Sequence, residues 1–245
     1  MCTLIGLWRS VAGYDLVVGM NRDESITRPS DPPAVLPGTP VIVAPRDRHA
    51  GGTWIGASGT GLVVALSNRR GRASPTARSR GQLVLDAMRQ SSVAAVDVFL
   101  EREVREHEYN FWNLFVASRK EVRFFRFDGE LSMARGHEGL NILTNDGGNG
   151  ATDPKVQLIQ GLLAKAPGTS EDVVRSLQRT LRTHASGGDP GLCVHAARGG
   201  TVSSTILALS NADPGEHVLL YTDGPPCTTP YRDYREVIRR LPSPD

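Results

Sequence analysis

The sequence has little of several features, and each shortage excludes a class of protein. Only three of the 245 residues are cysteine, which is too few for a disulfide-stapled scaffold. No apolar run approaches the roughly 18 residues that a membrane-spanning helix needs, and no secretory leader is visible. The net charge is only +2 and the hydrophobic content is 39%, which excludes general disorder. We therefore expect a soluble, cytoplasmic protein with a sizeable core and no membrane span.

Lysine is also scarce, since 25 of the 28 basic residues are Arg. The densest basic stretch, residues 69–80, contains Gly, Ser and Pro. Because Arg suits planar anions, this stretch is interpreted either as a solvated loop or as an anion clamp over a site, and Arg69 is a candidate substrate contact. No recognition motif accompanies it and the acids nearly cancel the charge, so we expect no nucleic-acid partner.

Hydrophobic patterning predicts strands in pairs, separated by two groups of helices. The first pair is a hairpin with its turn near Gly13, whereas residues 28–50, which hold six prolines, are expected to form an ordered loop. Ser92 and Asp153 are candidate helix caps, and Pro154 suits a first helical position. Strands are expected at Leu4–Trp8, Val17–Met20, Leu62–Ser67, Phe111–Ala117, Val122–Phe127, Leu140–Thr144, Val202–Leu209 and His217–Tyr221; helices are expected around Leu83–Met88, Val96–Val104, Val156–Leu163 (ending at Pro167-Gly168) and Val173–Leu181 (after a capping box from Thr169 to Asp172).

This order of elements predicts the architecture. Hairpins favour antiparallel sheets, and each pair of amphipathic helices needs a sheet face to cover. The economical solution is an α/β (α+β) fold, a four-layer αββα sandwich of two stacked, mainly antiparallel sheets. We expect a single domain over residues 1–245, in which 241–245 form a frayed tail.

Cys2 is the first candidate for chemistry. If Met1 is removed, Cys2 carries both a thiol and a free α-amine, and that amine has an ordinary pKa of about 7.7–8.0, close to working pH. One residue then supplies a nucleophile and a base. The strand predicted immediately afterwards would hold Cys2 rigidly. The alternative is that Cys2 is simply the outer end of that strand.

A polar tetrapeptide, Asn21-Arg22-Asp23-Glu24, follows the second predicted strand directly. Polar groups at the end of a buried strand are costly unless they are partnered or exposed. If the first two strands are neighbours, Asp23 accepts a hydrogen bond from the amine or thiol of Cys2, and Arg22 holds an anionic group. Asn21 and Glu24 are candidate substrate contacts. A hairpin end with solvated charges is the alternative.

Three further positions fit the walls of such a site. Trp54, in the segment Gly51-Gly52-Thr53-Trp54-Ile55-Gly56, offers an apolar or stacking surface, although a strand with a glycine bend explains the same pattern. Asn68 and Asn145 each end a predicted strand. A carboxamide donates two hydrogen bonds and suits an oxyanion hole, but Asn is equally a normal strand-terminating residue.

No metal site is expected. Cys193 and His195 lie two residues apart and could bind a metal or a haem iron, but no further close ligand is visible in the sequence, which favours a packing role. The sequence has no HExxH, CxxC, GxGxxG or GxxxxGK[ST] pattern, so it gives no support for a zinc, dinucleotide or P-loop site.

Seven segments follow one another along the chain: Met1-Cys2-Thr3-Leu4, Asn21-Arg22-Asp23-Glu24, Gly51-Gly52-Thr53-Trp54-Ile55-Gly56, Ser67-Asn68, Thr144-Asn145, Pro154-Lys155-Val156 and Ser203-Ser204-Thr205. Together they resemble a known family, the NRDE family of transport-and-Golgi-organisation type 2 proteins, from residue 1 to about residue 210. That family is similar to N-terminal-nucleophile hydrolases with an αββα sandwich, including cysteine acylases that act on penicillin V and bile salts. The resemblance implies the four-layer fold, Cys2 as nucleophile, Asp23 as partner of the N-terminal amine, and Asn68 and Asn145 as oxyanion or amine contacts.

Two classes of function follow. The first is an N-terminal-cysteine amidohydrolase or acyltransferase that takes an acyl group from a small amide or ester and needs no cofactor. The second is a non-catalytic carrier or chaperone for haem or an acyl lipid such as acyl-CoA, in which Cys2 or a His contacts the ligand. A class II glutamine amidotransferase domain is disfavoured, because those usually begin Met-Cys-Gly and Thr3 stands here instead.

Overall fold

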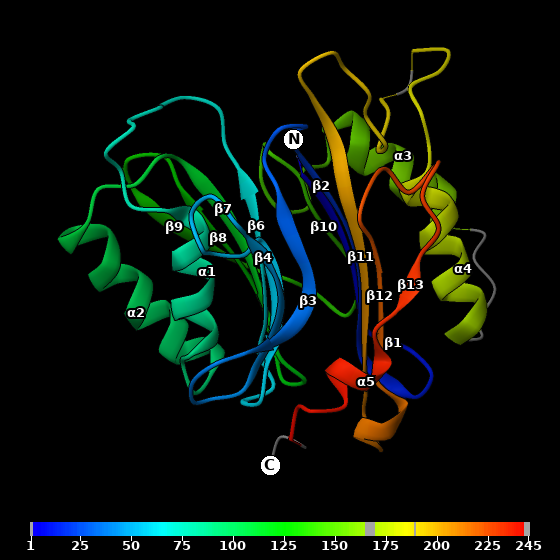
Figure 1. Cartoon of the computed structure of the whole chain (residues 1–245), viewed down its shortest axis with the longest axis horizontal. Coiled ribbons are helices and arrows are strands. Elements are labelled where there is room, and N and C mark those ends of the chain that lie inside the picture. Colours follow the sequence, from blue (N-terminus) through cyan, green and yellow to red (C-terminus); the bar gives the residue numbers. More distant parts are fainter. Residues whose placement is uncertain (1, 165–169, 189, 243–245) are drawn as a thin grey trace.

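The structure is a computed structural model that describes residues 2–164, 170–188 and 190–242. In this part of the chain, the strands form two sheets with only antiparallel pairing, and helices cover the outer face of each sheet. Figure 1 shows the resulting four layers, with α1 and α2 on one outside and α3 and α4 on the other. The predicted αββα sandwich is therefore confirmed.

The six-stranded sheet has the order β10-β1-β2-β11-β12-β13, so its two central strands are β2 and β11. The first hairpin pairs Leu4 with Met20 and turns at Gly13, where φ is +83° and glycine is favoured. Strand β11 then pairs with the other edge of β2, which places Thr201 opposite Asp23. The strands are β1 (Thr3–Val11), β2 (Tyr14–Ser25), β10 (Gly139–Leu143), β11 (Gly199–Ser210), β12 (Val218–Thr222) and β13 (Arg232–Asp233).

The seven-stranded sheet runs in simple sequence order from β3 to β9. Its first hairpin corrects one expectation, because residues 28–50 contain β3 and β4 rather than a loop throughout. Pro32 and Pro33 are tolerated because β3 is an edge strand with an irregular register between Asp31 and Ala34. The strands are β3 (Ser30–Leu36), β4 (Ile42–Asp47), β5 (Ile55–Ser58), β6 (Val63–Asn68), β7 (Trp112–Ala117), β8 (Val122–Phe127) and β9 (Leu131–Arg135).

Two helices begin at the caps that the sequence predicted, whereas α1 begins at Arg80, before the expected Leu83. The hydroxyl of Ser92 accepts a hydrogen bond from the amide of Ala95, and the Asp153 carboxylate accepts one from the amide of Lys155. Apolar stripes of α1 and α2 pack on the seven-stranded sheet, and those of α3 and α4 pack on the six-stranded sheet. Residues 165–169, which hold the predicted helix end and part of the capping box, lie outside the described residues. The helices are α1 (Arg80–Met88), α2 (Val93–Glu106), α3 (Pro154–Leu163), α4 (Ser170–Leu181), α5 (Arg235–Ile238) and the short 3-10 helix η1 (Pro214–Glu216).

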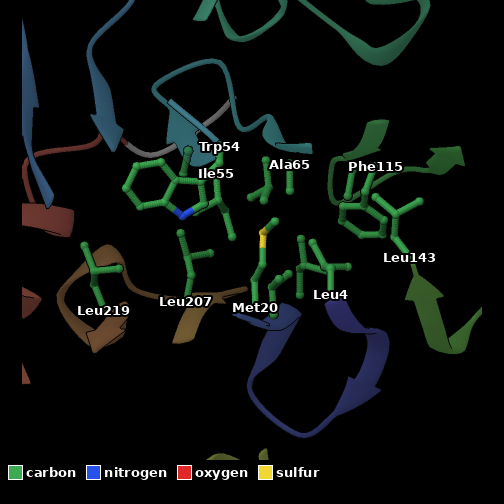
Figure 2. Packing of buried hydrophobic residues seen from close by; sticks show 14 of the residues in the cluster. Leu4, Met20, Trp54, Ile55, Ala65, Phe115, Leu143, Leu207 and Leu219 are labelled. Atoms are coloured by element: carbon green, nitrogen blue, oxygen red, sulfur yellow. The ribbon is translucent and has the colours of Figure 1, made fainter. Parts of the chain in front are cut away.

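The central core lies between the two sheets. Leu4 and Met20 of one sheet meet Ile55 and Phe115 of the other (Figure 2). Leu241 belongs to the same cluster and is 4% exposed, so the expected frayed tail is packed at its first residue. None of the described helices is long and apolar enough to cross a membrane.

Candidate active site

Cys2 immediately precedes β1, which pairs with β2 on one side and with β10 on the other. Thr3 pairs with Asn21 of β2, and this register brings Cys2 level with Arg22 and beside Asp23. The Cys2 side chain is buried, and its Sγ lies 4.0 Å from the backbone carbonyl oxygen of Asp23, to which the thiol donates a weak hydrogen bond. Burial raises the pKa of this thiol, and the negative charge of Asp23 raises it further.

The Asp23 carboxylate is held by a hydroxyl that sequence reasoning missed. Thr201 of β11 donates a 2.6 Å hydrogen bond to Asp23 Oδ1, and the Thr201 hydroxyl itself accepts one of 2.9 Å from the amide of Val194. Burial raises the pKa of Asp23, although the bond from Thr201 opposes that shift. Residues 23 and 201 are far apart in sequence, so only the β2–β11 register brings them together.

Arg22 links the two sheets. Its guanidinium carbon lies 4.0 Å from the ring centroid of Trp54, and its Nη2 lies 4.0 Å from Asp47 Oδ2. The predicted stacking surface of Trp54 is thus covered by a residue of the same site. Arg22 is only 4% exposed, and burial lowers its pKa.

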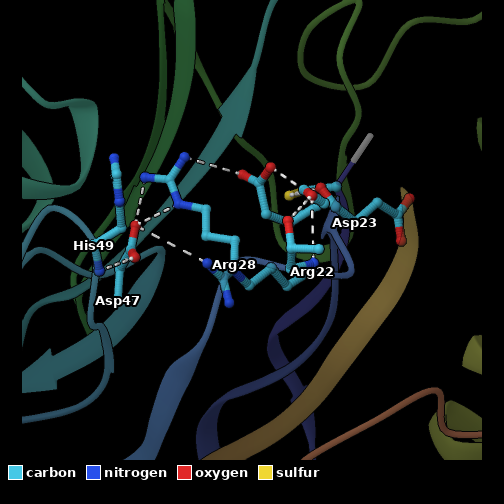
Figure 3. Close-up of polar contacts among 9 residues, drawn as sticks. Arg22, Asp23, Arg28, Asp47 and His49 are labelled. Carbon is cyan, nitrogen blue, oxygen red and sulfur yellow. Dashed lines mark hydrogen bonds and ion pairs between the residues drawn. The ribbon is translucent and has the colours of Figure 1, made fainter. Parts of the chain in front are cut away.

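Asp47 is the centre of a polar network on the far side of Arg22, and Figure 3 shows Arg22, Arg28 and His49 arranged around it. Arg28 Nε donates to Asp47 Oδ2 at 2.9 Å, and the amide of His49 donates to Oδ1 at 2.9 Å. Burial alone would raise the pKa of Asp47, but these hydrogen bonds and the charges of Arg28 and Arg22 lower it overall. Arg28 also pairs with Glu24 at 3.5 Å. Neither Arg28 nor Asp47 was singled out from the sequence, because both lie in the region expected to be a loop.

The three predicted asparagines have different surroundings. Asn68 lines the site cavity. The amide of Asn145 donates to Ser67 Oγ at 3.1 Å and to the backbone carbonyl of Asn68, so its donors hold the end of β6. The amide of Asn21 donates to the carbonyls of Leu181 (2.8 Å) and Leu192 (2.9 Å), on the side of α4.

Two cationic residues sit close to this centre without lining the cavity. Arg69 donates to the carbonyls of Asn145 and Asp146 and lies 3.6 Å from Asp128, so it braces the loop after β10. Its substrate contact therefore stays a prediction. Lys155 Nζ donates to Thr3 Oγ1 at 3.1 Å, and its charge lowers the pKa of Asp23. The segment Pro154-Lys155-Val156 was the sequence signal that could have placed Lys155 here.

The cavity in front of Cys2 has a volume of about 310 Å³. Its walls come from both sheets and from the loop before α1. Arg80 lines it, donates to the carbonyl of Phe111 at 2.9 Å, and makes no ion pair within 4.0 Å among the described residues. The charged residues of the wall are Arg22, Asp23, Glu24, Arg28, Asp47, Arg78 and Arg80. This cavity suits a polar molecule that carries a negative charge.

A second group of reactive side chains lies apart from this cavity. No further ligand lies close to Cys193 and His195 in the sequence, but the fold supplies two candidates from distant segments. The fold brings His184 and Cys227 to them, so that one ligand atom from each of the four residues lies within 4.8 Å of all the others.

Comparison with known proteins identifies relatives over most of the chain. Residues 1–213 match the family described as "Transport and Golgi organisation 2". The "Transport and Golgi organization 2 homolog" of Mus musculus is 33% identical over 108 residues, which are 42% of this chain and 39% of that protein. The Homo sapiens "Transport and Golgi organization protein 2 homolog" is 29% identical over 147 residues, 58% of this chain and 47% of that protein. The chain thus matches less than half the length of these curated relatives.

Solved structures share the fold. A Caenorhabditis elegans N-acylethanolamine-hydrolyzing acid amidase ortholog has a TM-score of 0.56 at 12% identity and covers 84% of this chain and 92% of its own. Penicillin V acylase from Agrobacterium tumefaciens has a TM-score of 0.58 at 9% identity, with coverages of 98% and 88%. The C2A mutant of the conjugated bile acid hydrolase from Clostridium perfringens has a TM-score of 0.52 at 11% identity, with coverages of 96% and 96%. The architecture is that of N-terminal-nucleophile hydrolases, and at these identities the likeness extends to the fold alone.

Proposed function

The chain belongs to the Transport and Golgi organisation 2 family, and from that premise we propose that it is an N-terminal-cysteine amidohydrolase or acyltransferase. The observation that carries the proposal is the position of Cys2. Its thiol is held at the start of β1, 4.0 Å from the carbonyl of Asp23, in a polar cavity of about 310 Å³. A fold shared with amidases and acylases supports the same reaction class without establishing it.

The proposed reaction starts with removal of Met1, which frees the α-amine of Cys2. The amine takes the thiol proton, and the thiolate attacks the carbonyl carbon of an amide or ester. The Asn68 carboxamide donates to the oxyanion that forms. The oxyanion then collapses and expels an amine or alcohol, which takes its proton from the α-ammonium. Water or an acceptor next attacks the thioester and gives up a proton to the amine. The Cys2 thiolate then leaves and takes that proton back from the ammonium, which restores the thiol and the free amine.

The other residues position this machinery. Asp23, fixed by Thr201, accepts a hydrogen bond from the α-amine and stabilises the ammonium that forms each time the amine takes up a proton. Asn145 holds Asn68 at the end of β6 through its bond to the Asn68 carbonyl. We assign Asn145 to positioning rather than to oxyanion contact, because its amide already donates to two protein oxygens.

The cavity wall suggests the substrate class. Arg22 and Arg80 both line the cavity, and burial lowers the pKa of each, because burial penalises the charged form. Binding an anion would offset part of that cost. We therefore propose acyl substrates that carry a carboxylate, phosphate or sulfonate group within reach of these two arginines. Three contacts support this wall. Asn21 donates to the carbonyl of Leu181, Glu24 pairs with Arg28, and the ring of Trp54 stacks with Arg22.

Intact mass measurement tests the nucleophile. Protein with no N-terminal tag is weighed before and after brief exposure to iodoacetamide, and the adduct is located by digestion. We expect a mass lower by one methionine and an adduct on Cys2, absent from Cys2→Ser. Retained Met1 together with an unlabelled Cys2 would contradict the proposal.

A matched protein isolates the role of the amine. An N-terminal extension blocks the α-amine of Cys2, and a protease that leaves Cys2 as the first residue restores it. Labelling of Cys2 at neutral pH is expected to accelerate after cleavage, because the free amine then accepts the thiol proton. An unchanged rate would remove the amine from the mechanism.

The non-catalytic alternative predicts different behaviour from the same cavity. Arginines that hold an acyl substrate would also hold the carboxylates of haem or the phosphates of acyl-CoA. Under that alternative, haem or acyl-CoA raises the melting temperature of the wild-type protein, and neither compound is turned over. Turnover of a thioester or amide that depends on Cys2 would count against carriage.

A further inference from the structure

Four metal-ligating side chains meet on the outside of the six-stranded sheet, away from the Cys2 cavity. His184 follows α4, Cys193 and His195 lie in the segment that leads into β11, and Cys227 follows β12. Cys193 is buried, Cys227 is half-buried, and the two His residues are exposed. Both cysteines are free thiols. The three segments are separate in sequence, so this convergence is a product of the fold.

The three distances among Cys193, His195 and Cys227 lie near the edges of a coordination tetrahedron, and the ligand atom of His184 lies within 4.8 Å of the other three. Zn–S and Zn–N bonds of about 2.3 and 2.0–2.1 Å imply edges of about 3.8 Å between two sulfurs and about 3.5 Å between sulfur and nitrogen. The two Sγ atoms are 3.5 Å apart, and His195 Nε2 lies 3.2 Å from Cys227 Sγ and 3.8 Å from Cys193 Sγ. The rings of His184 and His195 have centroids 5.2 Å apart.

From this geometry we propose that His184, Cys193, His195 and Cys227 bind one zinc ion in a tetrahedral Cys2His2 site. Thiolate and imidazole ligands suit zinc and exclude calcium or magnesium, which take oxygen ligands. Four side chains that converge on one point fit a tetrahedral ion better than a haem iron, which takes at most two axial ligands from the protein. Protein side chains fill all four coordination positions, so the ion is structural and has no open coordination position for a substrate.

The proposed ion fastens a loop that holds the catalytic candidates. Val194, between two of the ligands, donates its amide to Thr201, and Thr201 donates to Asp23. Leu192, next to Cys193, accepts from the amide of Asn21. Two residues of the Asn21-Arg22-Asp23-Glu24 segment therefore depend on the position of this one loop. His184, Cys193, His195 and Cys227 act as positioning residues for Asp23.

A second contact joins the same segments without the ion. Arg182 Nε donates to the carbonyl of Pro226 at 2.9 Å, one residue before Cys227. The segment after β12 is therefore already docked beside the end of α4. Zinc would then lock an arrangement that the chain prefers, which favours binding because less chain entropy is lost on coordination.

The first experiment measures metal content. Protein free of any histidine tag, purified without chelators, is analysed by elemental mass spectrometry, and about one zinc per chain is expected. Cys227→Ser and His184→Ala should each bind several-fold less zinc after dialysis. Cys2→Ser is the matched control and should keep the wild-type content, because Cys2 lies outside the cluster. A zinc content that is unchanged in both cluster variants, or absent from wild type even after reconstitution, would overturn the proposal.

A second measurement on wild type protects against variants that fail to fold. Cobalt(II) added to zinc-depleted protein should give the intense visible absorption of a tetrahedral thiolate complex, and added zinc should abolish it. A Cys193–Cys227 disulfide is the competing outcome, and a non-reduced mass lower by two hydrogens with no cobalt spectrum would establish it instead. Neither readout requires catalysis, so zinc binding stands or falls separately from the proposed reaction.

Discussion

Arg80 shows how a single residue can set the charge preference of the cavity. It lines the cavity, donates a hydrogen bond to the backbone carbonyl of Phe111, and faces no ion-pair partner within 4.0 Å among the described residues. Arg22 beside it is offset by Asp47, and Arg28 by Asp47 and Glu24. The positive potential at Cys2 should therefore depend strongly on Arg80.

The corresponding prediction uses two reagents of similar size and different charge. Iodoacetate is anionic and iodoacetamide is neutral, and the ratio of their rates at Cys2 reports the local potential. Arg80→Gln should lower this ratio by about threefold to tenfold, with a smaller effect at high salt. Arg48→Gln is the control, because that side chain is 61% exposed and pairs with Asp31 outside the cavity. An equal ratio in wild type and Arg80→Gln would contradict the assigned role.

Asp47 gives a pH-dependent prediction. Its pKa is lowered in the folded protein, so its carboxylate stabilises the fold above the unfolded pKa of about 3.9, and that contribution is lost as the pH falls through the folded pKa. Asp47→Asn should lower the free energy of unfolding by about 1–3 kcal/mol at pH 7. The difference from wild type should shrink as the pH falls below about 4, as measured by urea unfolding at each pH.

Asp31→Asn is the control for that experiment. Asp31 also pairs with an arginine, Arg48, but the carboxylate is 42% exposed. An exposed pair of this kind contributes little, so a change below about 1 kcal/mol is expected at every pH. If Asp31→Asn lowered the free energy of unfolding as much as Asp47→Asn, the buried network around Asp47 would contribute no more stability than an exposed ion pair.

At the scale of elements, the connection between β4 and β5, residues 48–54, packs directly against α1. A Cβ atom on Gly52 would lie 2.3 Å from the backbone carbon of Gly81 and 2.6 Å from the amide nitrogen of Gln82. Thr53 also donates its amide to the carbonyl of Gly81 at 3.1 Å. This close approach fixes the relative positions of Trp54 and Arg80, which lie on the two contacting segments and both line the cavity.

Two glycine substitutions should therefore have opposite effects. Gly52→Ala should lower stability by about 2 kcal/mol or more, because backbone must move, and it should also slow labelling of Cys2. Gly161→Ala, in α3 with nothing within 4 Å of the added Cβ, should raise stability by about 0.5–1 kcal/mol. Thermal unfolding of both variants tests the pair, and a neutral Gly52→Ala would show that α1 is free to shift.

The elements that the sequence predicted well are those with local signals. Hairpin turns, helix caps and apolar stripes involve residues a few positions apart, and the sandwich follows from them. The β3–β4 hairpin was missed because Pro32 and Pro33 break the usual strand pattern, and only an edge position accommodates them. Strand β13 and helix α5 are too short to show a period.

The residues of the candidate site show the same difference between local and long-range signals. Cys2 and Asn21-Arg22-Asp23-Glu24 were found because they form compact patterns in the sequence. Thr201, Asp47, His184 and Cys227 reach their partners only through strand register or loop packing across many residues. Nothing within a short window marks them, so pattern reasoning had no means to select them.

At the scale of the whole molecule, the core between the sheets determines how far apart the cavity walls stand. Cys2 and Arg22 come from one sheet, and Trp54 and Asn68 come from or next to strands of the other. Leu241 closes this core near the end of the described chain, and Pro242 beside it packs within 2.9 Å of the position that a Cβ on Gly59 would take. The last described residues therefore help hold the sheets together.

Leu241→Ala should lower the free energy of unfolding by about 2–4 kcal/mol, because it leaves a cavity in a packed core. For a chain of this size that corresponds to a fall in melting temperature of roughly 5–15 °C. Leu162→Ala is the control, since Leu162 is 42% exposed on α3, and it should change stability by less than about 0.5 kcal/mol. Equal effects of the two substitutions would show that the tail does not close the core.

The burial of Cys2 has a consequence for the timing of biosynthesis. In the folded protein β1 is paired on both sides, with β2 and β10, and Cys2 is 5% exposed, so an aminopeptidase has little access to Cys2 once the sheet has formed. Strand β10 leaves the ribosome more than 130 residues after Cys2, on the order of ten seconds later at ordinary translation rates. Under the proposed mechanism, the enzyme is matured in that interval, on the nascent chain, and a molecule that folds with Met1 in place stays inactive.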